Sequence, residues 1–288
     1  MVESDNMNFT PVIIVGAGRS GTNAFRDLLS EQKGFVTWPC DEIDAIWMHG
    51  NIGKATDVLT KEDLNDKAIV CIRSAFKKIW QGTNANFVVE KTCANSLRVD
   101  FIAEVLPEAK FIHIKRDVMD VVVSSRKRWK GEFELPYLSY YLRKARFVPI
   151  SDIPTYLMRY LKIRLSLIFG NEKHVRRWGP WTNKLQTLIQ ENAPIEEICA
   201  VQWLECVGAI EREFKLLSES RRLTITYEDL VTQSQRTMNE VLEFLGARVD
   251  ESDLQSSLKA LSTGSVGKGR LQLKAEAIDL SHIIKPEV

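Results

Sequence analysis

The residues of this sequence best suited to chemistry lie in a glycine-rich segment, Gly16–Thr22 (GAGRSGT), between a short apolar run and a predicted helix. Glycines let the backbone approach an anion closely, and the start of the helix adds unpaired N–H groups. The spacing fits G-x-G-x-x-G, the dinucleotide-binding motif, with Asp41 and Glu42 about twenty residues later. It also fits a Walker-like G-x-x-x-x-G-T motif that lacks the usual lysine after the last glycine. Arg19 supplies the cation instead. Bulky Phe25 in the next turn argues against the dinucleotide motif. The segment predicts an anion-binding turn.

A second predicted anion site lies further along the chain, in Phe111–Ser124 (FIHIKRDVMDVVVS). Arg116 falls at the end of a predicted strand, and Ser124 falls two turns into the helix that follows. A guanidinium fork and a hydroxyl can together bind a phosphate group. Two separate anion sites suit 3'-phosphoadenylyl sulfate (PAPS), which carries a 5'-phosphosulfate and a 3'-phosphate.

Three segments in order, the RSGT turn, R-D-x-x-D-x-x-x-S and the later ITYEDL ending at Leu230, resemble the PAPS-dependent sulfotransferases of the bacterial and carbohydrate type. The resemblance covers about residues 11–128 and 195–270. It implies that the 5'-phosphosulfate is held at the first turn and the 3'-phosphate at Arg116 and Ser124, with Tyr227 near the adenine. A final loop, Gly264–Arg270, is implied to lie over the 3'-phosphate. The donor-binding residues expected on this basis are Arg19, Ser20, Gly21, Thr22, Asn23, Arg116, Ser124, Tyr227, Ser265 and Lys268, with Arg270 as a further candidate.

Two cations are expected to stabilise the transferring group. Arg19 stands where many relatives have lysine; both are cations, although arginine does not donate a proton at neutral pH. Lys91, in Glu90-Lys91-Thr92 after a predicted strand, belongs to an element that resembles carbohydrate sulfotransferases. The alternative for Lys91 is a surface lysine at a strand end, with Glu90 as its structural partner. By analogy with phosphoryl transfer, positioning and electrostatics do most of the catalysis in an in-line displacement.

A general base must take the proton of the acceptor. Glu42 sits where tyrosylprotein and heparan-type relatives place a catalytic glutamate, so the resemblance implies this role for it. Asp41, Asp44 and His49 remain alternatives, and carboxylates just past a strand are commonly helix caps. His113 lies inside a predicted strand and is expected to be a packed core histidine.

Apolar runs alternating with amphipathic segments place these residues on a fold. Strands are predicted at residues 11–15, 34–38, 86–89, 111–114 and 223–226, and helices at 22–29, 61–80, 117–128, 194–217 and 235–245. This alternation predicts an α/β, P-loop-like three-layer fold with a central parallel sheet. We expect one sulfotransferase domain over residues 1–288. A helical insertion over roughly 131–190 is expected to cap the carboxyl edge of the sheet, where ligands bind.

The insertion is expected to choose the acceptor. Its segment Arg176–Trp181 (RRWGPW) resembles bacterial and polysaccharide-type sulfotransferases. Tryptophans stack on sugar rings and arginines bind uronate or sulfate groups, which favours a glycan or glycolipid acceptor and hence carbohydrate sulfation. Ordinary core tryptophans are the alternative for Trp178 and Trp181. Tyr156–Phe169 mixes apolar and basic residues and either rests on an anionic membrane or packs as a cap helix.

Composition narrows the class of protein. The chain has 288 residues and a net charge of +1, yet residues 115–177 carry fifteen Lys and Arg against six Asp and Glu, which favours an anionic ligand. The five cysteines are scattered without a C-x-x-C pair, so neither a disulfide framework nor a metal site is expected. No secretory or membrane-spanning segment is recognised. We expect a cytoplasmic enzyme with at most peripheral membrane contact and no nucleic-acid partner.

Two other functions remain open at this stage. A Rossmann-type NAD(P)- or FAD-dependent oxidoreductase would use the first turn but offers no role for Arg116 with Ser124. A catalytically silent module would bind the nucleotide without transferring a group.

Overall fold

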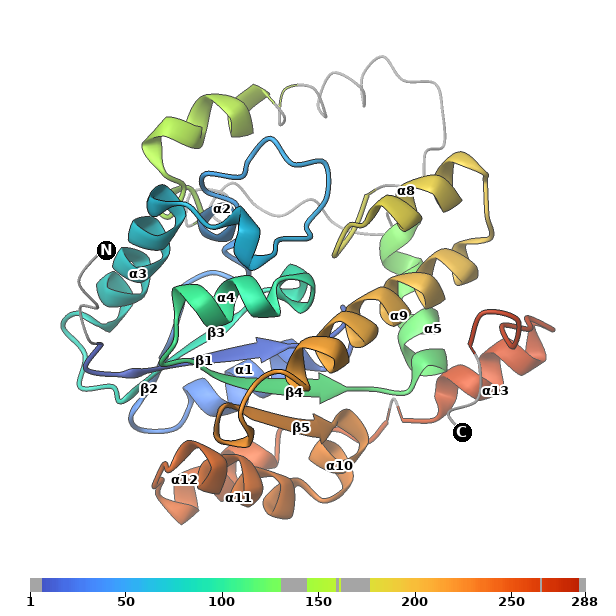
Figure 1. Ribbon diagram of the computed structural model, residues 1–288. Helices are drawn as coiled ribbons and strands as arrows, with labels where there is room; N and C mark the ends of the chain where they lie inside the picture. Colours follow the sequence, from blue (N-terminus) through green and yellow to red (C-terminus); the bar gives the residue numbers. More distant parts are fainter. Residues whose placement is uncertain (1–6, 131–143, 159–160, 162–176, 265, 285–288) are drawn as a thin grey trace.

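The central feature of the computed structural model is a parallel sheet of five strands in the order β2-β3-β1-β4-β5 (Figure 1). The structure describes residues 7–130, 144–158, 161, 177–264 and 266–284. The strands are β1 (Thr10–Val15), β2 (Phe35–Thr37), β3 (Phe87–Lys91), β4 (Lys110–Lys115) and β5 (Arg222–Thr226). All five match predicted strands, and β3 extends far enough to include Lys91. The predicted α/β fold with a central parallel sheet is confirmed.

The strand order distinguishes the two motifs that the glycine turn satisfies. β1 lies between β3 and β4, with Ile13 opposite Glu90 on one side and opposite Phe111 on the other. In the Rossmann order the first strand lies beside the second instead. The sheet therefore has P-loop-like rather than Rossmann topology.

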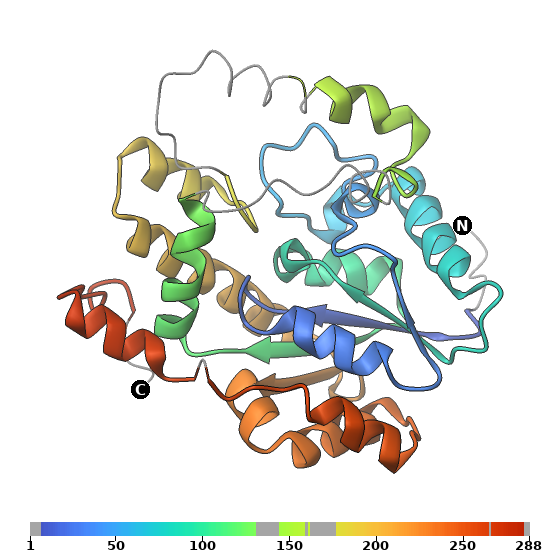
Figure 2. The ribbon, with the colours of Figure 1, turned by 180° about the vertical axis from the view of Figure 1, so that it is seen from behind.

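Helices cover both faces of the sheet because its strands are buried on both sides (Figures 1 and 2). Ile13 and Val15 of β1 point to one face, and Val12 and Ile14 to the other. The first face is covered by α3 (Asp66–Trp80), α4 (Val99–Val105) and α9 (Ile195–Phe214). The second is covered by α1 (Thr22–Ser30), α11 (Ser234–Leu245) and α12 (Glu251–Leu258).

A third apolar cluster stands beside the carboxyl edge of the sheet. It joins α5 (Val118–Trp129), α8 (Asn183–Gln190), α9 and α13 (Lys268–Ala275) around Trp129. The shorter elements are α2 (Asp44–Trp47), α10 (Tyr227–Thr232) and the 3-10 helices Lys61–Asp63, Cys93–Leu97, Ile150–Asp152 and Glu219–Arg221. Much of the predicted insertion over 131–190 lies outside the described residues.

Two predicted elements differ from the structure. The helix expected over 61–80 is divided, because the Asn65 side chain accepts from the amide of Ala68 and starts α3 afresh. The final segment Gly264–Arg270, expected as a loop, enters α13 at Lys268. Its helix begins after Gly267, which has the left-handed φ of 74° that glycine tolerates.

Candidate active site

The Gly16–Thr22 turn leads from β1 into α1 at the carboxyl edge of the sheet. The first α1 amide bonded within the helix is that of Phe25, which donates to the carbonyl of Gly21 at 3.0 Å. The amides before it mark the open N-terminus of the helix, where an anion is stabilised. Ser96 fixes the base of the turn, because its hydroxyl accepts from the amide of Gly16 at 3.1 Å and donates to its carbonyl at 3.0 Å.

Two aromatic rings explain why the turn needs glycines. A Cβ at Gly18 would lie 2.8 Å from the Trp178 ring, and a Cβ at Gly21 would overlap the Tyr227 ring. Gly21 also has a φ of 89°. Trp178, which the sequence suggested for a sugar, thus packs against the Gly16–Thr22 turn.

The two predicted anion sites meet in space. Arg19 Nε donates to Ser124 Oγ at 2.9 Å, and Arg116 Nη1 donates to the carbonyl of Arg19 at 3.0 Å. Arg19 has a φ of 73°, which is unusual for a residue with a side chain and typical of strained functional positions. The Arg116 guanidinium also stacks on the Tyr227 ring, 4.3 Å from its centroid. The first turn, Arg116, Ser124 and Tyr227 therefore form one site.

This site is electropositive. Burial and then the positive charge of Arg116 lower the pKa of Arg19, yet a guanidinium stays protonated at neutral pH. Arg116 has a carboxylate of Asp120 at 3.9 Å. In the described part of the chain no carboxylate pairs with Arg19. A bound anion would relieve the repulsion between the two arginines.

The residues present fit a PAPS molecule. The Ser20 hydroxyl is fully buried, and among the described residues it has no hydrogen-bond partner. A buried hydroxyl at the start of a helix, next to Thr22 and two guanidiniums, is a donor set suited to phosphate and sulfate oxygens. Asn23 is exposed on the first turn of α1.

Lys91 and Glu42, the predicted cation and base, also meet. Lys91 Nζ lies 2.8 Å from Glu42 Oε1 and 3.9 Å from Asp41 Oδ1, and only 2% of the Lys91 side chain is exposed. The surface-lysine alternative is therefore wrong. The amide of Cys93 donates to Glu42 Oε1 at 3.3 Å, and Cys93 Sγ lies 3.9 Å from Thr22 Oγ1. These contacts connect the Lys91–Glu42 pair to the glycine turn.

Each member of the Lys91–Glu42 pair shifts the pKa of the other. Burial would raise the pKa of Glu42, but the Lys91 ammonium outweighs burial and holds it below the ordinary value. Burial would lower the pKa of Lys91, whereas Cys93, Glu42 and Asp41 raise it above its ordinary value. Burial and then Glu42 raise the pKa of the Cys93 thiol to about 12, so the thiol is neutral. Both members of the pair are charged at neutral pH.

Glu90 is a buried residue whose role the sequence left open. Its side chain accepts from Thr92 Oγ1 at 2.6 Å and from Asn95 Nδ2 at 2.7 Å. Thr92 Oγ1 in turn accepts from the amide of Ile43 at 3.2 Å. Burial raises the pKa of Glu90 to about 7. Glu90 therefore supports the backbone next to Glu42, and the ion pair of Lys91 is with Glu42 instead of Glu90, the alternative that the sequence left open.

The rival bases have other partners. Asp41 Oδ1 accepts from Arg26 Nη1 at 2.8 Å, and Asp44 Oδ1 accepts from Arg98 Nη1 at 2.8 Å. His49 Nδ1 lies 2.7 Å from Asp152. His113 is a core residue as predicted, since it is buried in β4 and burial lowers its pKa to about 4.

The C-terminal segment approaches the same site from α13. Ser265 lies outside the described residues, Lys268 is exposed, and Arg270 pairs with Asp117 at 2.8 Å. The buried Asp120 carboxylate accepts from the amides of Gly267 at 2.8 Å and Gly269 at 2.6 Å. These two hydrogen bonds, which hold the start of α13 against the start of α5, could not be predicted from the sequence.

In the segment expected to bind a sugar, some of the described side chains contact other residues of the protein instead. Arg176 lies outside the described residues. Trp181 is buried in the third cluster, its amide donates to Asp57 at 2.8 Å, and Arg177 stacks over its ring at 4.8 Å. Arg177 also lies 3.4 Å from Asp57. Trp181 is thus a core residue, the alternative that the sequence left open.

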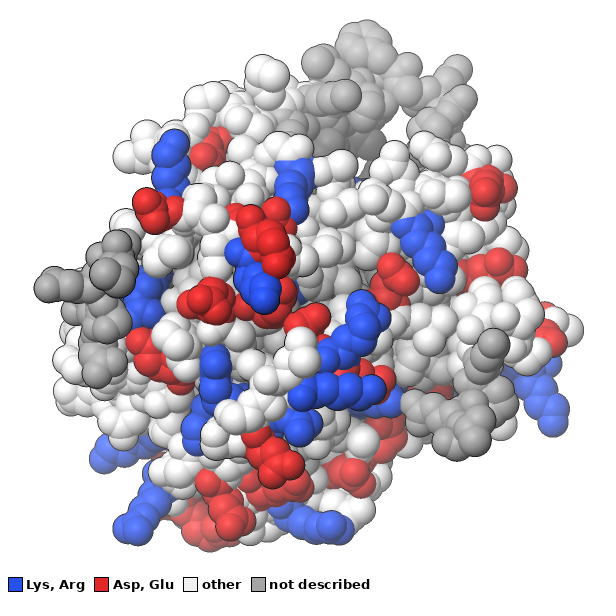
Figure 3. Space-filling view, viewed as in Figure 1, with Lys and Arg blue, Asp and Glu red and all other residues white. Residues whose placement is uncertain are grey.

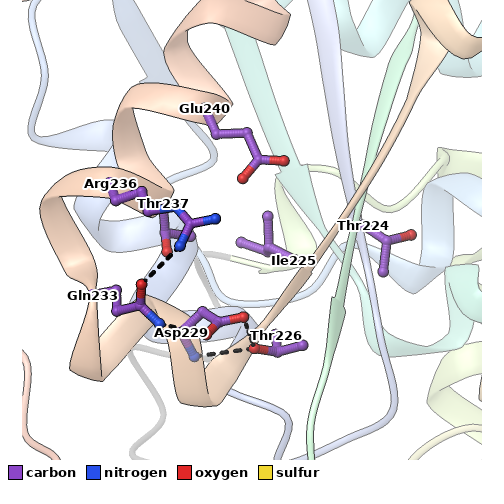
Figure 4. A pocket seen from close by; sticks show the side chains of 8 residues that line it. All are labelled: Thr224, Ile225, Thr226, Asp229, Gln233, Arg236, Thr237 and Glu240. Carbon is purple, nitrogen blue, oxygen red and sulfur yellow. Dashed lines mark hydrogen bonds between the residues drawn. The ribbon is translucent and has the colours of Figure 1, made fainter.

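A separate polar pocket of about 290 Å³ lies beside β5, between α10 and α11 (Figure 4). Its polar groups bond one another, as Thr226 does with Asp229 at 2.7 Å and Arg236 with Gln233 at 2.9 Å. It includes none of the predicted site residues.

Comparison with known proteins identifies the family of the chain. The profile of the sulfotransferase family matches residues 11–165, more than half of the chain. A search of curated proteins finds no sequence match. Among solved structures, a sulfotransferase domain from the curacin biosynthetic pathway aligns with a TM-score of 0.50 and 12% identity, over 96% of this chain and all of that one. One from the Synechococcus PCC 7002 olefin synthase gives 0.49 and 16%, over 99% and 91%. A mouse sulfotransferase complexed with PAP gives 0.46 and 15%, over 91% and 67%.

The fold and site define a P-loop-like α/β protein with an electropositive candidate site. The chain belongs to the sulfotransferase family. Among the described residues, no helix is both long and apolar enough to cross a bilayer.

Proposed function

We propose that this enzyme transfers the sulfuryl group of PAPS to a hydroxyl or amine of a glycan or glycolipid. The single observation that carries the proposal is the contact of the two anion sites through Arg19, Arg116 and Ser124. One donor with two anionic ends can then occupy both sites. The Gly16–Thr22 turn would hold the 5'-phosphosulfate, and Arg116 with Ser124 the 3'-phosphate. Lys268 and Ser265 would contribute from the C-terminal segment.

In this mechanism, PAPS supplies a sulfuryl group whose sulfur–oxygen bond to the 5'-phosphate is weak. Arg19 and Lys91 provide positive charge where negative charge develops on the sulfuryl and leaving oxygens. The acceptor oxygen or nitrogen bonds to sulfur as the bond to the phosphate oxygen breaks. Glu42 takes the acceptor proton, and adenosine 3',5'-bisphosphate leaves.

The Lys91–Glu42 contact suggests how the base is activated. Paired with Lys91, Glu42 is a weak base because its pKa is low. When Lys91 turns towards a sulfuryl oxygen, Glu42 loses its counter-charge while remaining part-buried. Removing the Lys91 charge would raise the pKa of Glu42, which would make it a stronger base.

Different observations support the acceptor class and the location of the enzyme. The half-buried Trp178 beside the glycine turn, and the basic residues of the insertion, favour an anionic glycan or glycolipid. All five cysteines are unpaired, which supports a reducing compartment such as the cytoplasm.

Two assays test the proposal. A thermal-shift panel with adenosine 3',5'-bisphosphate, NAD, NADP and ATP should show stabilisation by the bisphosphate above the others. Labelled PAPS is then offered with a library of glycans, glycolipids and small alcohols and amines. Transfer to a sugar acceptor is the expected result. Nucleotide binding without transfer to any acceptor would instead indicate a silent nucleotide-binding module.

A further inference from the structure

Exposed apolar side chains gather on one segment of the insertion. Eight large hydrophobic residues are exposed in the described part of the chain, and five of them fall within residues 150–161. These five, called here the apolar ridge, are Ile150, Ile153, Leu157, Met158 and Leu161. The exposed fractions of Ile150 and Met158 are 86% and 72%. Single exposed hydrophobics are ordinary, but a cluster of five marks an interaction surface.

The spacing of the ridge follows one side of a helix. Ile150, Ile153, Leu157 and Leu161 are separated by three, four and four residues. Residues 153–158 are helical and continue the 3-10 helix Ile150–Asp152. In Figure 1 this segment lies at the upper edge of the molecule, away from the sheet.

The inner side of the segment is fixed to the body of the protein. The buried Asp152 pairs with His49 at 2.7 Å, and the Phe147 ring packs edge-on against Trp38, with centroids 5.1 Å apart. These contacts orient the apolar ridge outwards. Its exposure therefore belongs to the folded protein and is not a consequence of a detached segment.

The charge of the sequence on either side of the ridge indicates its partner. Residues 143–164 of the sequence contain six Lys or Arg and one acidic residue, Asp152. Asp152 is buried against His49, so it adds no negative charge to the exposed face, whereas Arg146 is exposed. At the upper left of Figure 3, where the segment lies, the visible surface is mostly uncharged, with basic and acidic side chains beside it. A sequence that mixes apolar and basic residues in this way is typical of segments that lie on anionic lipid surfaces.

We propose that the apolar ridge docks this enzyme on the surface of an anionic lipid bilayer. His49 and Trp38, which hold the segment, flank the stretch that carries Glu42. Docking would therefore turn the Glu42 side of the active site towards the lipid surface. This favours an acceptor anchored in the bilayer. The inference about the acceptor rests on the proposed function, whereas the docking does not depend on it.

Vesicle co-sedimentation of the full chain tests the docking. Vesicles of phosphatidylcholine alone are compared with vesicles that also contain phosphatidylglycerol. The ridge variant is Leu157→Ser with Met158→Ser, and the matched control is Leu216→Ser with Leu271→Ser, whose leucines are 80% and 72% exposed elsewhere. We expect wild type and control to bind the anionic vesicles and the ridge variant to bind at least about tenfold more weakly. Salt should weaken the binding.

Three outcomes would overturn the docking proposal: no binding of wild type to anionic vesicles, equal binding by the ridge variant, or an equal loss in the control. A wild-type dimer that the ridge substitutions make monomeric, seen by sedimentation without vesicles, would identify the ridge as a protein interface instead. Unfolding curves check that both variants fold. Transfer to a water-soluble acceptor should be the same in all three proteins, so a failed docking result leaves the proposed function standing.

Discussion

Replacing Glu42 with glutamine separates its two roles, as partner of the Lys91 ammonium and as proposed base. The amide keeps the shape and an oxygen that can accept from Cys93, but it carries no charge. If Glu42 takes the acceptor proton, the variant should lose about 10²-fold or more in kcat. Binding of adenosine 3',5'-bisphosphate should change less than about threefold, because the nucleotide contacts are elsewhere.

The effect on stability follows from the Lys91 environment. Removing one partner of a fully buried ion pair costs about 3–5 kcal/mol. Here the Glu42 side chain is 33% exposed and Asp41 remains 3.9 Å from Lys91 Nζ, so we expect about 2 kcal/mol. For a domain of this size that corresponds to a fall in Tm of about 4–8 °C.

Single-turnover transfer from labelled PAPS, nucleotide calorimetry and thermal unfolding together measure these quantities. Asp41→Asn is the matched control, since Asp41 also faces Lys91 but pairs with Arg26. It should retain most of its kcat. Wild-type kcat in Glu42→Gln would refute the role of Glu42, and a selective loss in Asp41→Asn would move that role to Asp41.

Three further predictions rest on other contacts. Arg116→Gln should weaken binding of adenosine 3',5'-bisphosphate about 10- to 100-fold, measured by calorimetry. Binding of adenosine 5'-monophosphate, which has no 3'-phosphate, should weaken less than about threefold. Equal losses for the two nucleotides would contradict a 3'-phosphate site at Arg116. Gly269→Ala should destabilise the protein by about 2 kcal/mol in urea, because its Cβ would overlap the Met119 backbone, whereas Gly53→Ala, with open space around it, should be neutral. Because burial raises the pKa of Glu90 from 4.5 to about 7, its ionisation opposes folding. The unfolding free energy should therefore fall by about 3 kcal/mol as pH rises through that range, a fall that Glu90→Gln lacks; parallel pH curves would contradict this.

The strands and the first turn could be predicted because their signals are local. A buried parallel strand is a short apolar run, as in Pro11–Val15, and the turn after it shows its glycines directly. The order of the strands is not local. The contact between Lys91 and Glu42 exists because β3 lies beside β2, a pairing that spacing along the chain does not encode.

The missed parts of the site are long-range contacts. The start of α13 depends on Asp120, which lies on another helix, while the glycines at its own beginning suggest a loop. Trp178 and Gly18 are in contact although they lie far apart in the sequence, and nothing in the sequence marks Ser96 as a partner of Gly16. Such partners become visible only in the folded protein.

A crystal structure of the protein with adenosine 3',5'-bisphosphate would test the central claim most directly. We predict that one nucleotide spans the site, with its 5'-phosphate at the amides of Ser20–Thr22 and its 3'-phosphate at Arg116 and Ser124. A nucleotide whose phosphates lie away from either group, or in the pocket beside β5, would contradict it.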